Sequence, residues 1–213
     1  PIMAAPDRFK ISIFGKGGHG AEPHLSKDAI VTASQLVVQL QQIISRRVNP
    51  LDSAVVSVGR FVADNAFNII ADQVELEGTV RTFKESVRDQ VKHELERIVQ
   101  GVCLANDCTY KLDYFEGYPA VVNHKEETEF LAELARNVPG VSQVTEIAPR
   151  MVGEDFAYYL QHVKGTFFFT GARPENGPAY PHHHPKFDFN EKAMLIAAKT
   201  LISCAIRYQS EHE

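Results

Sequence analysis

Residues 53–83 read SAVVSVGRFVADNAFNIIADQVELEGTVRTF, and the fold class is predicted from their pattern. Its two ends, at 53–62 and 73–83, are rich in β-branched residues and alternate apolar with polar positions, which is typical of half-buried strands. Asp64 and Asn65 lie in the turn-prone stretch between them. The sequence therefore predicts two neighbouring antiparallel strands here.

Similar patterns lie on both sides of this pair. Apolar and polar residues alternate from Phe9 to Phe14 and from Thr109 to Phe115, which indicates two further strands. Apolar residues recur at helical spacing from Ile30 to Ile44, after Asp28 as a possible N-cap, and again from Ser86 to Leu104. The order β-α-β-β-α-β predicts the ferredoxin-like arrangement, in which two helices cover one face of an antiparallel sheet.

We place this domain at residues 9–120 and assign residues 1–8 and 121–213 to a layered α/β domain. In the second domain, short apolar runs predict strands near Val144 and at TFFFTG, residues 166–171. Helices are expected at 126–137, in GEDFAYYLQHV at 153–163, and at 190–207. So few strands make a poor independent sheet, and we expect this α/β domain to be incomplete.

Composition narrows the class of protein. With 213 residues, of which 44% are hydrophobic, the chain can bury a sizeable core. Its net charge of -5 and its dispersed lysines and arginines argue against a nucleic-acid partner. No apolar run approaches the roughly 20 residues of a membrane span, so we predict a cytoplasmic protein without a membrane partner. The odd cysteine count suits a reducing compartment, and buried free thiols are expected at Cys103 and Cys108.

A glycine-rich loop surrounds a histidine in GKGGHGAEPH, residues 15–24. Four glycines around His19 leave the backbone free to take positive φ and to approach a ligand closely. The alternative is that this loop is only a tight turn.

A second loop, YPHHHPKFDFNE at 180–191, holds three consecutive histidines between two prolines. The prolines restrict the backbone, and neutral imidazole is the commonest metal ligand. A solvated histidine run is the alternative. Taken together, the two loops predict a functional site.

Five segments of the chain, in this order, resemble one family. They are IMAAPDRFKISIFGKGGHGAEPHLSKDAI, VVSVGRF, NAFNIIADQVELEGTVRTF, MVGEDFAYYL and HHHPKFDFNEKAM. The chain resembles the zinc-dependent amidohydrolase and metallopeptidase family of aminoacylases, hippurate hydrolase, auxin-conjugate hydrolases and carboxypeptidase G. The resemblance covers essentially the whole chain.

The resemblance implies a metal-dependent amidohydrolase that cleaves N-acyl amino acids to a carboxylic acid and an amino acid. It implies that a complete site binds two divalent metal ions, which are zinc, manganese, cobalt or nickel. It also implies a homodimer formed through the lid domain at 9–120. Because members of this family are longer, we expect the N-terminal catalytic part and its metal ligands to be absent here. The chain alone is then expected to be inactive. The alternative function is a non-catalytic dimerisation or folding module.

The resemblance also implies roles for single residues. His183 matches a metal ligand, and His19 matches a lid histidine that donates a hydrogen bond to the developing oxyanion.

Asn68 and Arg81 match positions that hold the carboxylate of the substrate, which suits an amide donor and a guanidinium. Without the resemblance, they are a turn asparagine and a surface arginine at a strand end. Three further residues are candidates for orienting the metal ligands: Glu154, Asp155 and His184. For Asp155, a helix N-cap is the first interpretation.

Overall fold

The computed structural model describes residues 1–212, with side chains through Glu211, and the chain divides into two compact units. The first unit comprises Pro1–Val121 with Pro149–Tyr158. The second comprises Val122–Ala148 and the chain from Tyr159 onward. The structure is a mixed α/β one with an antiparallel sheet, and this coarse class is the predicted one.

The first unit is built on a four-stranded antiparallel sheet in the order β3-β5-β1-β6. Its first strand begins four residues earlier than the predicted strand. Because β6 pairs with β1 only from Arg8 onward, Pro6 lies where β1 has a partner on one side only, so its missing N–H is tolerated. The strands are β1 (Ala5–Phe14), β3 (Ala54–Val62), β5 (Gln73–Thr82) and β6 (Thr109–Phe115).

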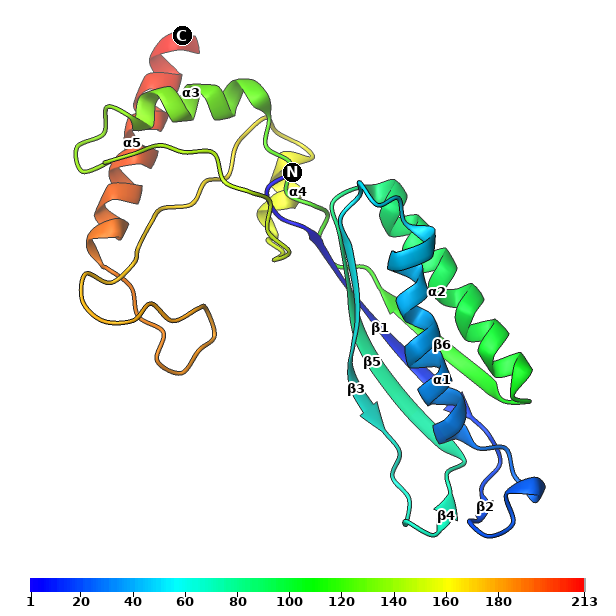
Figure 1. Ribbon diagram of the computed structural model, residues 1–213. Coiled ribbons are helices and arrows are strands. Elements are labelled where there is room, and N and C mark those ends of the chain that lie inside the picture. Colours follow the sequence, from blue (N-terminus) through cyan, green and yellow to red (C-terminus); the bar gives the residue numbers. More distant parts are fainter. Residues whose placement is uncertain (213) are drawn as a thin grey trace. The chain divides into compact units, whose positions relative to one another are not determined.

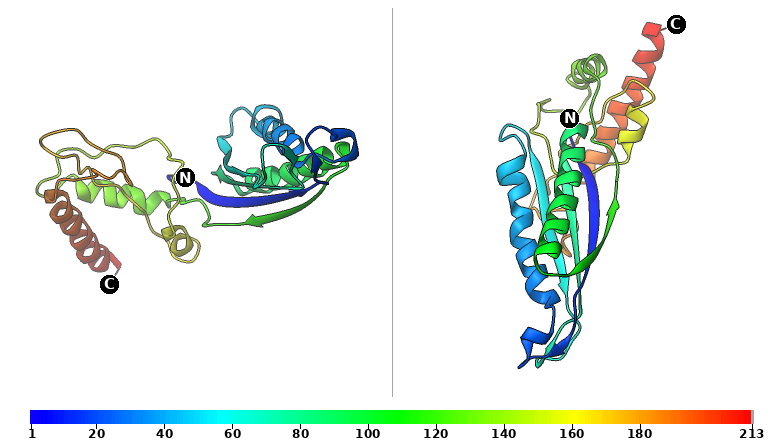
Figure 2. Two further views of the ribbon diagram at one scale, coloured as in Figure 1. Left: turned by 90° about the horizontal axis from the view of Figure 1, so that it is seen from below. Right: turned by 90° about the vertical axis from the view of Figure 1, so that its right-hand side faces the viewer.

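Two helices, α1 (Ala29–Gln42) and α2 (Glu85–Ala105), cover one face of this sheet (Figures 1 and 2). The carboxylate of Asp28 caps α1 as predicted, because its Oδ1 accepts the backbone N–H groups of Ile30 at 2.9 Å and Val31 at 3.0 Å. The chain then continues in a π-helical turn, η2 (Ile43–Arg47). The main elements follow the predicted order β-α-β-β-α-β.

The core lies between the sheet and the two helices. Alternate residues of β1 and β5 point into it, and all but one of those from Phe9 to Ile13 and from Val74 to Val80 are apolar and buried. Gly78 is the exception. A Cβ at this position would lie 2.1 Å from Cζ of Phe9, so glycine leaves the space that the phenylalanine ring fills.

The opposite face of the sheet carries charged side chains in cross-strand pairs. Glu77 pairs with Arg8 at 3.1 Å and with Arg60 at 2.6 Å, and Lys10 pairs with Glu75 at 2.8 Å. Surface pairs of this kind contribute little stability. These charged side chains mark this face of the sheet as the one away from the hydrophobic core.

The two ends of the segment Pro1–Val121 lie next to each other. The N–H of Ile2 donates to the carbonyl of Val121 at 2.8 Å, and the N–H of Val121 donates to the carbonyl of Met3 at 3.0 Å. Met3 also forms a parallel bridge with Arg150. The segment that begins at Pro149 is thereby held beside the start of β1.

The second unit is helical, with α3 (Lys125–Ala135), the end of α4 (Phe156–Leu160) and α5 (Lys192–His212). The strands predicted near Val144 and at 166–171 are wrong, because none of its residues up to 212 lies in a strand. An extended segment needs a neighbouring strand for its backbone groups. Here the side chain of Asn123 binds the backbone groups of Phe167 instead of a neighbouring strand. Its Oδ1 accepts the N–H of Phe167 at 2.9 Å, and its Nδ2 donates to the carbonyl of Phe167 at 2.8 Å.

Helix α5 leaves many apolar side chains in solvent. Four of them are between 57% and 66% exposed: Leu195, Leu201, Ile202 and Ile206. Even so, within residues 1–212 no helix combines the length and the hydropathy that crossing a membrane requires.

Candidate active site

A small two-stranded sheet at one end of the first unit brings two predicted site residues together (Figure 1). Strand β2 (Gly18–His19) pairs with β4 (Ile69–Ile70), so that His19 lies opposite Ile69. Beside this pair, the N–H of Gly20 donates to the carbonyl of Asn68 at 2.9 Å. We call this sheet, with the turn before β4 and the short helix η1 (Pro23–Leu25), the tip.

The glycines of the tip pack closely against their own chain. The expectation of positive φ is wrong, because only Gly140 and Gly177 have positive φ among the described glycines. A Cβ at Gly18 would lie 2.1 Å from Oγ of Ser26, and a Cβ at Gly20 would lie 2.8 Å from the carbonyl oxygen of Asn68. The loop therefore needs glycine in order to pack closely against its own chain.

The tautomer of His19 follows from one backbone contact. The N–H of Ala21 donates to Nδ1 of His19 at 3.0 Å. A neutral imidazole has one donor nitrogen and one acceptor nitrogen, so the proton of neutral His19 is on Nε2. The side chain is exposed, and its Nε2–H has no partner among the described residues.

Asn68 lies in a turn within the stretch that was predicted to be turn-prone, and the side chain of Asn65 braces this turn. The N–H of Ile69 donates to the carbonyl of Ala66 at 3.1 Å, and the side-chain amide of Asn65 donates to the carbonyls of both residues. Asn65 gave no signal beyond its turn propensity. The side-chain amide of Asn68 has no hydrogen-bond partner within residues 1–211.

Arg81 lies at the other end of the sheet. On β5 it pairs with Pro6 of β1 and Val55 of β3, eight residues beyond Gln73, where the strand begins near the tip. At about 3.3 Å per strand residue, that separation is roughly 26 Å. One copy of the chain therefore does not bring Arg81 to Asn68.

Arg81 also differs from the other cations of its sheet face. Arg8, Lys10 and Arg60 each pair with a glutamate. The half-buried side chain of Arg81 has no acidic partner in the described part of the chain. A guanidinium left in this state is available for a carboxylate ligand.

The segment GEDF begins at the same end of the sheet as Arg81. The ring of Pro6, which lies opposite Arg81, packs on Gly153 so closely that a Cβ there would be 2.4 Å from Cγ of the proline. The side chains of Glu154 and Asp155 form no hydrogen bond or ion pair with residues 1–211. The capping role considered for Asp155 is therefore wrong: its backbone carbonyl, not its carboxylate, accepts the N–H of Tyr158 at 3.0 Å.

The three-histidine loop lies in the second unit, and two of its rings have partners there. His184 stacks on Tyr180, with ring centroids 4.4 Å apart, and its Nδ1 accepts the N–H of Lys186 at 3.0 Å. His182 makes an edge contact with Phe187 at 5.0 Å.

His183 stands apart from its neighbours. Its φ of 67° is in the left-handed region, which costs a residue other than glycine about 1 kcal/mol or more. Its ring has no hydrogen bond or ring contact with the described residues. The predicted metal ligand is therefore the one histidine of the three whose ring has no partner among the described residues.

These residues do not fit a complete metal site on their own. Within residues 1–211, no three His, Cys, Asp or Glu side chains converge closely enough to hold an ion. Cys103 and Cys108 are buried free thiols as predicted, and burial raises the pKa of Cys103 to about 11.

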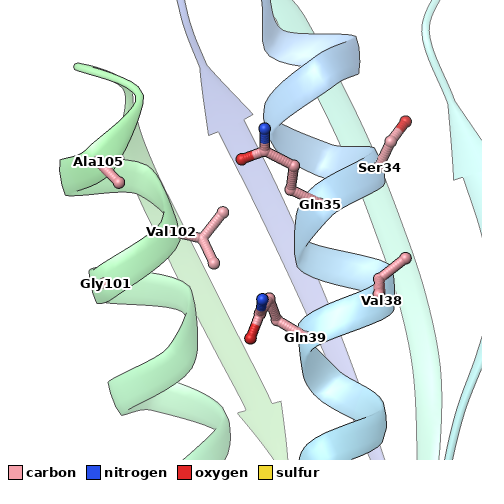
Figure 3. A pocket seen from close by; sticks show the side chains of 7 residues that line it. All are labelled: Ser34, Gln35, Val38, Gln39, Gly101, Val102 and Ala105. Carbon is pink, nitrogen blue, oxygen red and sulfur yellow. The ribbon is translucent and has the colours of Figure 1, made fainter.

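A shallow groove of about 520 Å³ lies between α1 and α2 (Figure 3). Its walls are mostly apolar, and none of the predicted site residues lines it. The lining residues are Ser34, Gln35, Val38, Gln39, Gly101, Val102 and Ala105.

Comparison with known proteins gives the chain its family. Residues 18–207 match the model of peptidase family M20/M25/M40. The chain is 59% identical over 208 residues to YhaA of Bacillus subtilis (strain 168), a match that covers 97% of this chain and 52% of YhaA. It is 40% identical over 213 residues to the N-acetyl-L-cysteine deacetylase of the same organism, covering 100% of this chain and 50% of that protein.

A solved structure agrees with these matches. The YXEP protein of Bacillus subtilis, described as a dinuclear metal-binding peptidase of the M20 family, superposes with a TM-score of 0.74 at 30% identity, covering 98% of this chain and 51% of that one. The chain thus spans about half the length of the relatives that it matches. The family resemblance carried by the five sequence segments is confirmed, and the chain belongs to peptidase family M20/M25/M40.

Proposed function

We propose that this chain forms part of a metal-dependent amidohydrolase that cleaves N-acyl amino acids to a carboxylic acid and an amino acid. The tip carries this proposal, because it joins a histidine with a free Nε2–H, His19, to an asparagine with a free side-chain amide, Asn68. The family and the name of the N-acetyl-L-cysteine deacetylase relative support the same substrate class.

Each proposed role rests on the donor groups of the side chain. His19 donates its Nε2–H to the oxygen that becomes negatively charged when the amide carbonyl is attacked, and a single donor of this kind contributes roughly 10²- to 10³-fold to a rate. The Asn68 amide and the Arg81 guanidinium hold the carboxylate of the amino-acid part. Both are donors without a partner in the described chain.

The distance between Asn68 and Arg81 supports a site that is shared between two copies of the chain. A separation of roughly 26 Å along β5 prevents one copy from placing both side chains on one carboxylate. We therefore assign residues 9–120 as a ferredoxin-like lid and dimerisation domain, through which the tip of one copy reaches the Arg81 end of the other. An open sheet has free edges that support such pairing. Residues 1–8 and 121–213 belong to the catalytic domain in this assignment.

The proposed metal site is completed by residues outside this sequence. His183 supplies one ligand, and Glu154, Asp155 and His184 orient the ligands. Zinc, manganese, cobalt and nickel all suit imidazole and carboxylate donors. A relative described as dinuclear supports two ions for each complete site.

A second candidate function applies to residues 1–213 alone, namely a non-catalytic dimerisation or folding module. One observation favours it: no three metal-ligating side chains converge within residues 1–211.

One experiment tests both candidates. The 213-residue chain and a chain of the relatives' full length that contains it are each assayed with N-acetyl and N-benzoyl amino acids, in zinc, manganese, cobalt or nickel, alongside metal analysis. We expect turnover and bound metal in the longer protein and neither in the 213-residue chain. If the longer protein hydrolyses none of these substrates with any of the four ions, the proposed activity is wrong. Turnover by the 213-residue chain would eliminate the second candidate.

A further inference from the structure

The turn that presents Asn68 also presents a phenylalanine with no packing partner. Phe67 is 103% exposed, although phenylalanine is among the residues most often buried. Single exposed apolar residues are common on proteins, so exposure alone assigns no role. The surroundings of Phe67 are what distinguish it.

The backbone holds Phe67 in place. It is one of the two apex residues of the turn that the N–H of Ile69 closes onto the carbonyl of Ala66 at 3.1 Å. The side chain of Asn65 braces both ends of this turn, with donor–acceptor distances of 3.1 and 2.6 Å. Phe67 is thus presented outward by an ordered turn.

The same turn and its neighbours carry the groups assigned to the substrate. Asn68 is the next apex residue, and His19 pairs with Ile69 on the adjoining strand. Two more tip side chains, Leu25 and Ile69, are 57% and 49% exposed. The tip therefore combines two unpartnered polar donors with an apolar surface.

We propose that Phe67 is a specificity-determining residue that contacts an apolar substituent of the N-acyl amino acid. This inference rests on the proposed function. In that function, the polar parts of the substrate are bound by His19, Asn68 and Arg81. What remains of an N-acyl amino acid is the acyl substituent and the amino-acid side chain, and either can lie on the phenyl ring.

The test compares Phe67→Ala and Phe67→Leu with the wild type in a chain of the relatives' full length that contains residues 1–213. One substrate series keeps glycine and enlarges the acyl group from acetyl to benzoyl. The other keeps acetyl and enlarges the side chain from glycine to leucine and phenylalanine. Leu51→Ala is the matched control, because Leu51 is a 91% exposed apolar loop residue of the same unit that lies outside the tip.

We expect Phe67→Ala to lower kcat/KM roughly 10-fold for the large members of one series, mainly through KM, with N-acetylglycine changed less than about 2-fold. Phe67→Leu should restore most of the loss, and Leu51→Ala should have no effect. A loss confined to the acyl series assigns the ring to the acyl group, and a loss confined to the other series assigns it to the side chain.

An equal loss on every substrate, or no loss on any, overturns the proposal. An equal loss would mean that the ring contacts protein or only supports the tip. Because Phe67 packs against nothing, the temperature of unfolding should not change in either variant. Failure of the wild type to hydrolyse any member of either series would instead overturn the proposed function, so the two failures are distinguishable.

Discussion

Arg88 of α2 binds the carboxylate of Asp7 in the interior of the first unit, with both side chains less than 10% exposed. Its Nε donates to Oδ2 at 2.8 Å and its Nη2 donates to Oδ1. The hydroxyl of Tyr114 and the N–H of Gly117 also donate to this carboxylate, at 2.7 and 2.9 Å. The contact ties the start of β1 to α2 and to the chain that leaves β6.

Replacing Asp7 with Asn should therefore destabilise the protein. The substitution removes the buried counter-ion of the Arg88 guanidinium and leaves only the exposed carboxylate of Glu85, 3.4 Å from Nη1. Breaking a buried ion pair in this way typically costs 3–5 kcal/mol. Asp113→Asn is the control, because it breaks only the exposed Lys111–Asp113 pair at 2.9 Å, which is worth about 1 kcal/mol or less. Urea unfolding followed by tyrosine fluorescence measures both. Equal midpoints for the two variants would contradict the assigned role of Asp7.

The same carboxylate should give the protein an acid-sensitive stability. Burial by itself would raise the pKa of Asp7, but the hydrogen bonds from Arg88, Gly117 and Tyr114 outweigh it and lower the pKa below its ordinary value of 3.8. A carboxyl group with a lowered folded-state pKa stabilises the fold above its unfolded-state pKa, and this contribution is lost as pH falls toward the folded value.

We therefore expect the free energy of unfolding of the wild type to fall as pH falls below about 4. Asp7→Asn has no carboxyl group here and should show a shallower dependence over that range. Unfolding curves at several pH values from about 5 to 2 compare the slopes. Parallel slopes for the two proteins would rule out this contribution from Asp7.

Two glycines of the first unit should respond in opposite ways to alanine. At Gly78, a Cβ would lie 2.1 Å from Cζ of Phe9 and 2.4 Å from the carbonyl oxygen of Ser57, so Gly78→Ala should cost about 1–3 kcal/mol through overpacking. At Gly101, on the exposed side of α2, nothing lies within 4 Å. Gly101→Ala should stabilise the helix by about 0.5–1 kcal/mol. Denaturation midpoints that move in the same direction would contradict this packing account.

In the longer protein, His19→Ala should lower kcat by roughly 10²- to 10³-fold with little change in KM, because the lost donor acts on charge that develops in the transition state. His24→Ala is the matched control, since His24 is another exposed histidine of the tip with no proposed role. Metal content should be unchanged in both variants. A loss of bound metal in His19→Ala would indicate that this histidine is a ligand and not an oxyanion donor.

Mixing two inactive variants should restore activity if the site is shared. The His19→Ala chain keeps Arg81, and the Arg81→Ala chain keeps the tip, so a mixed dimer contains one intact site and one doubly altered site. With random pairing, half of the dimers are mixed and half of their sites are intact, so about one quarter of the wild-type activity should return. Unfolding and refolding the two chains together, with each refolded alone as the control, measures this recovery. No recovery would contradict a site shared between two copies.

The four main strands could be predicted because each has one buried and one solvated face, which gives an alternating pattern. The two strands of the tip could not be predicted. A two-residue strand such as Gly18–His19 has no period to detect, and its partner is fixed by glycine packing and by the Asn65 side chain.

In the second unit, strands were predicted where the structure has none. The apolar run at 166–171 has the composition of a buried strand, but a strand also needs a neighbour, and composition does not report whether one is present. The site residues were named through the family resemblance. Their separation into the tip, the Arg81 end of the sheet and the histidine loop follows only from the register of β5 and the division into two units.

The backbone pairing of Ile2 and Met3 with Val121 makes the 119 residues between Met3 and Val121, counted inclusively, a closed loop of chain. Closing a loop costs entropy that grows only slowly with its length, by about 0.6 kcal/mol for each doubling. A change in the length of the turns inside this loop therefore leaves its two ends bonded to one another. The chain between Met3 and Val121 can therefore be lengthened at the tip, or exchanged for another folded module with adjacent ends, while Ile2, Met3 and Val121 keep their pairing.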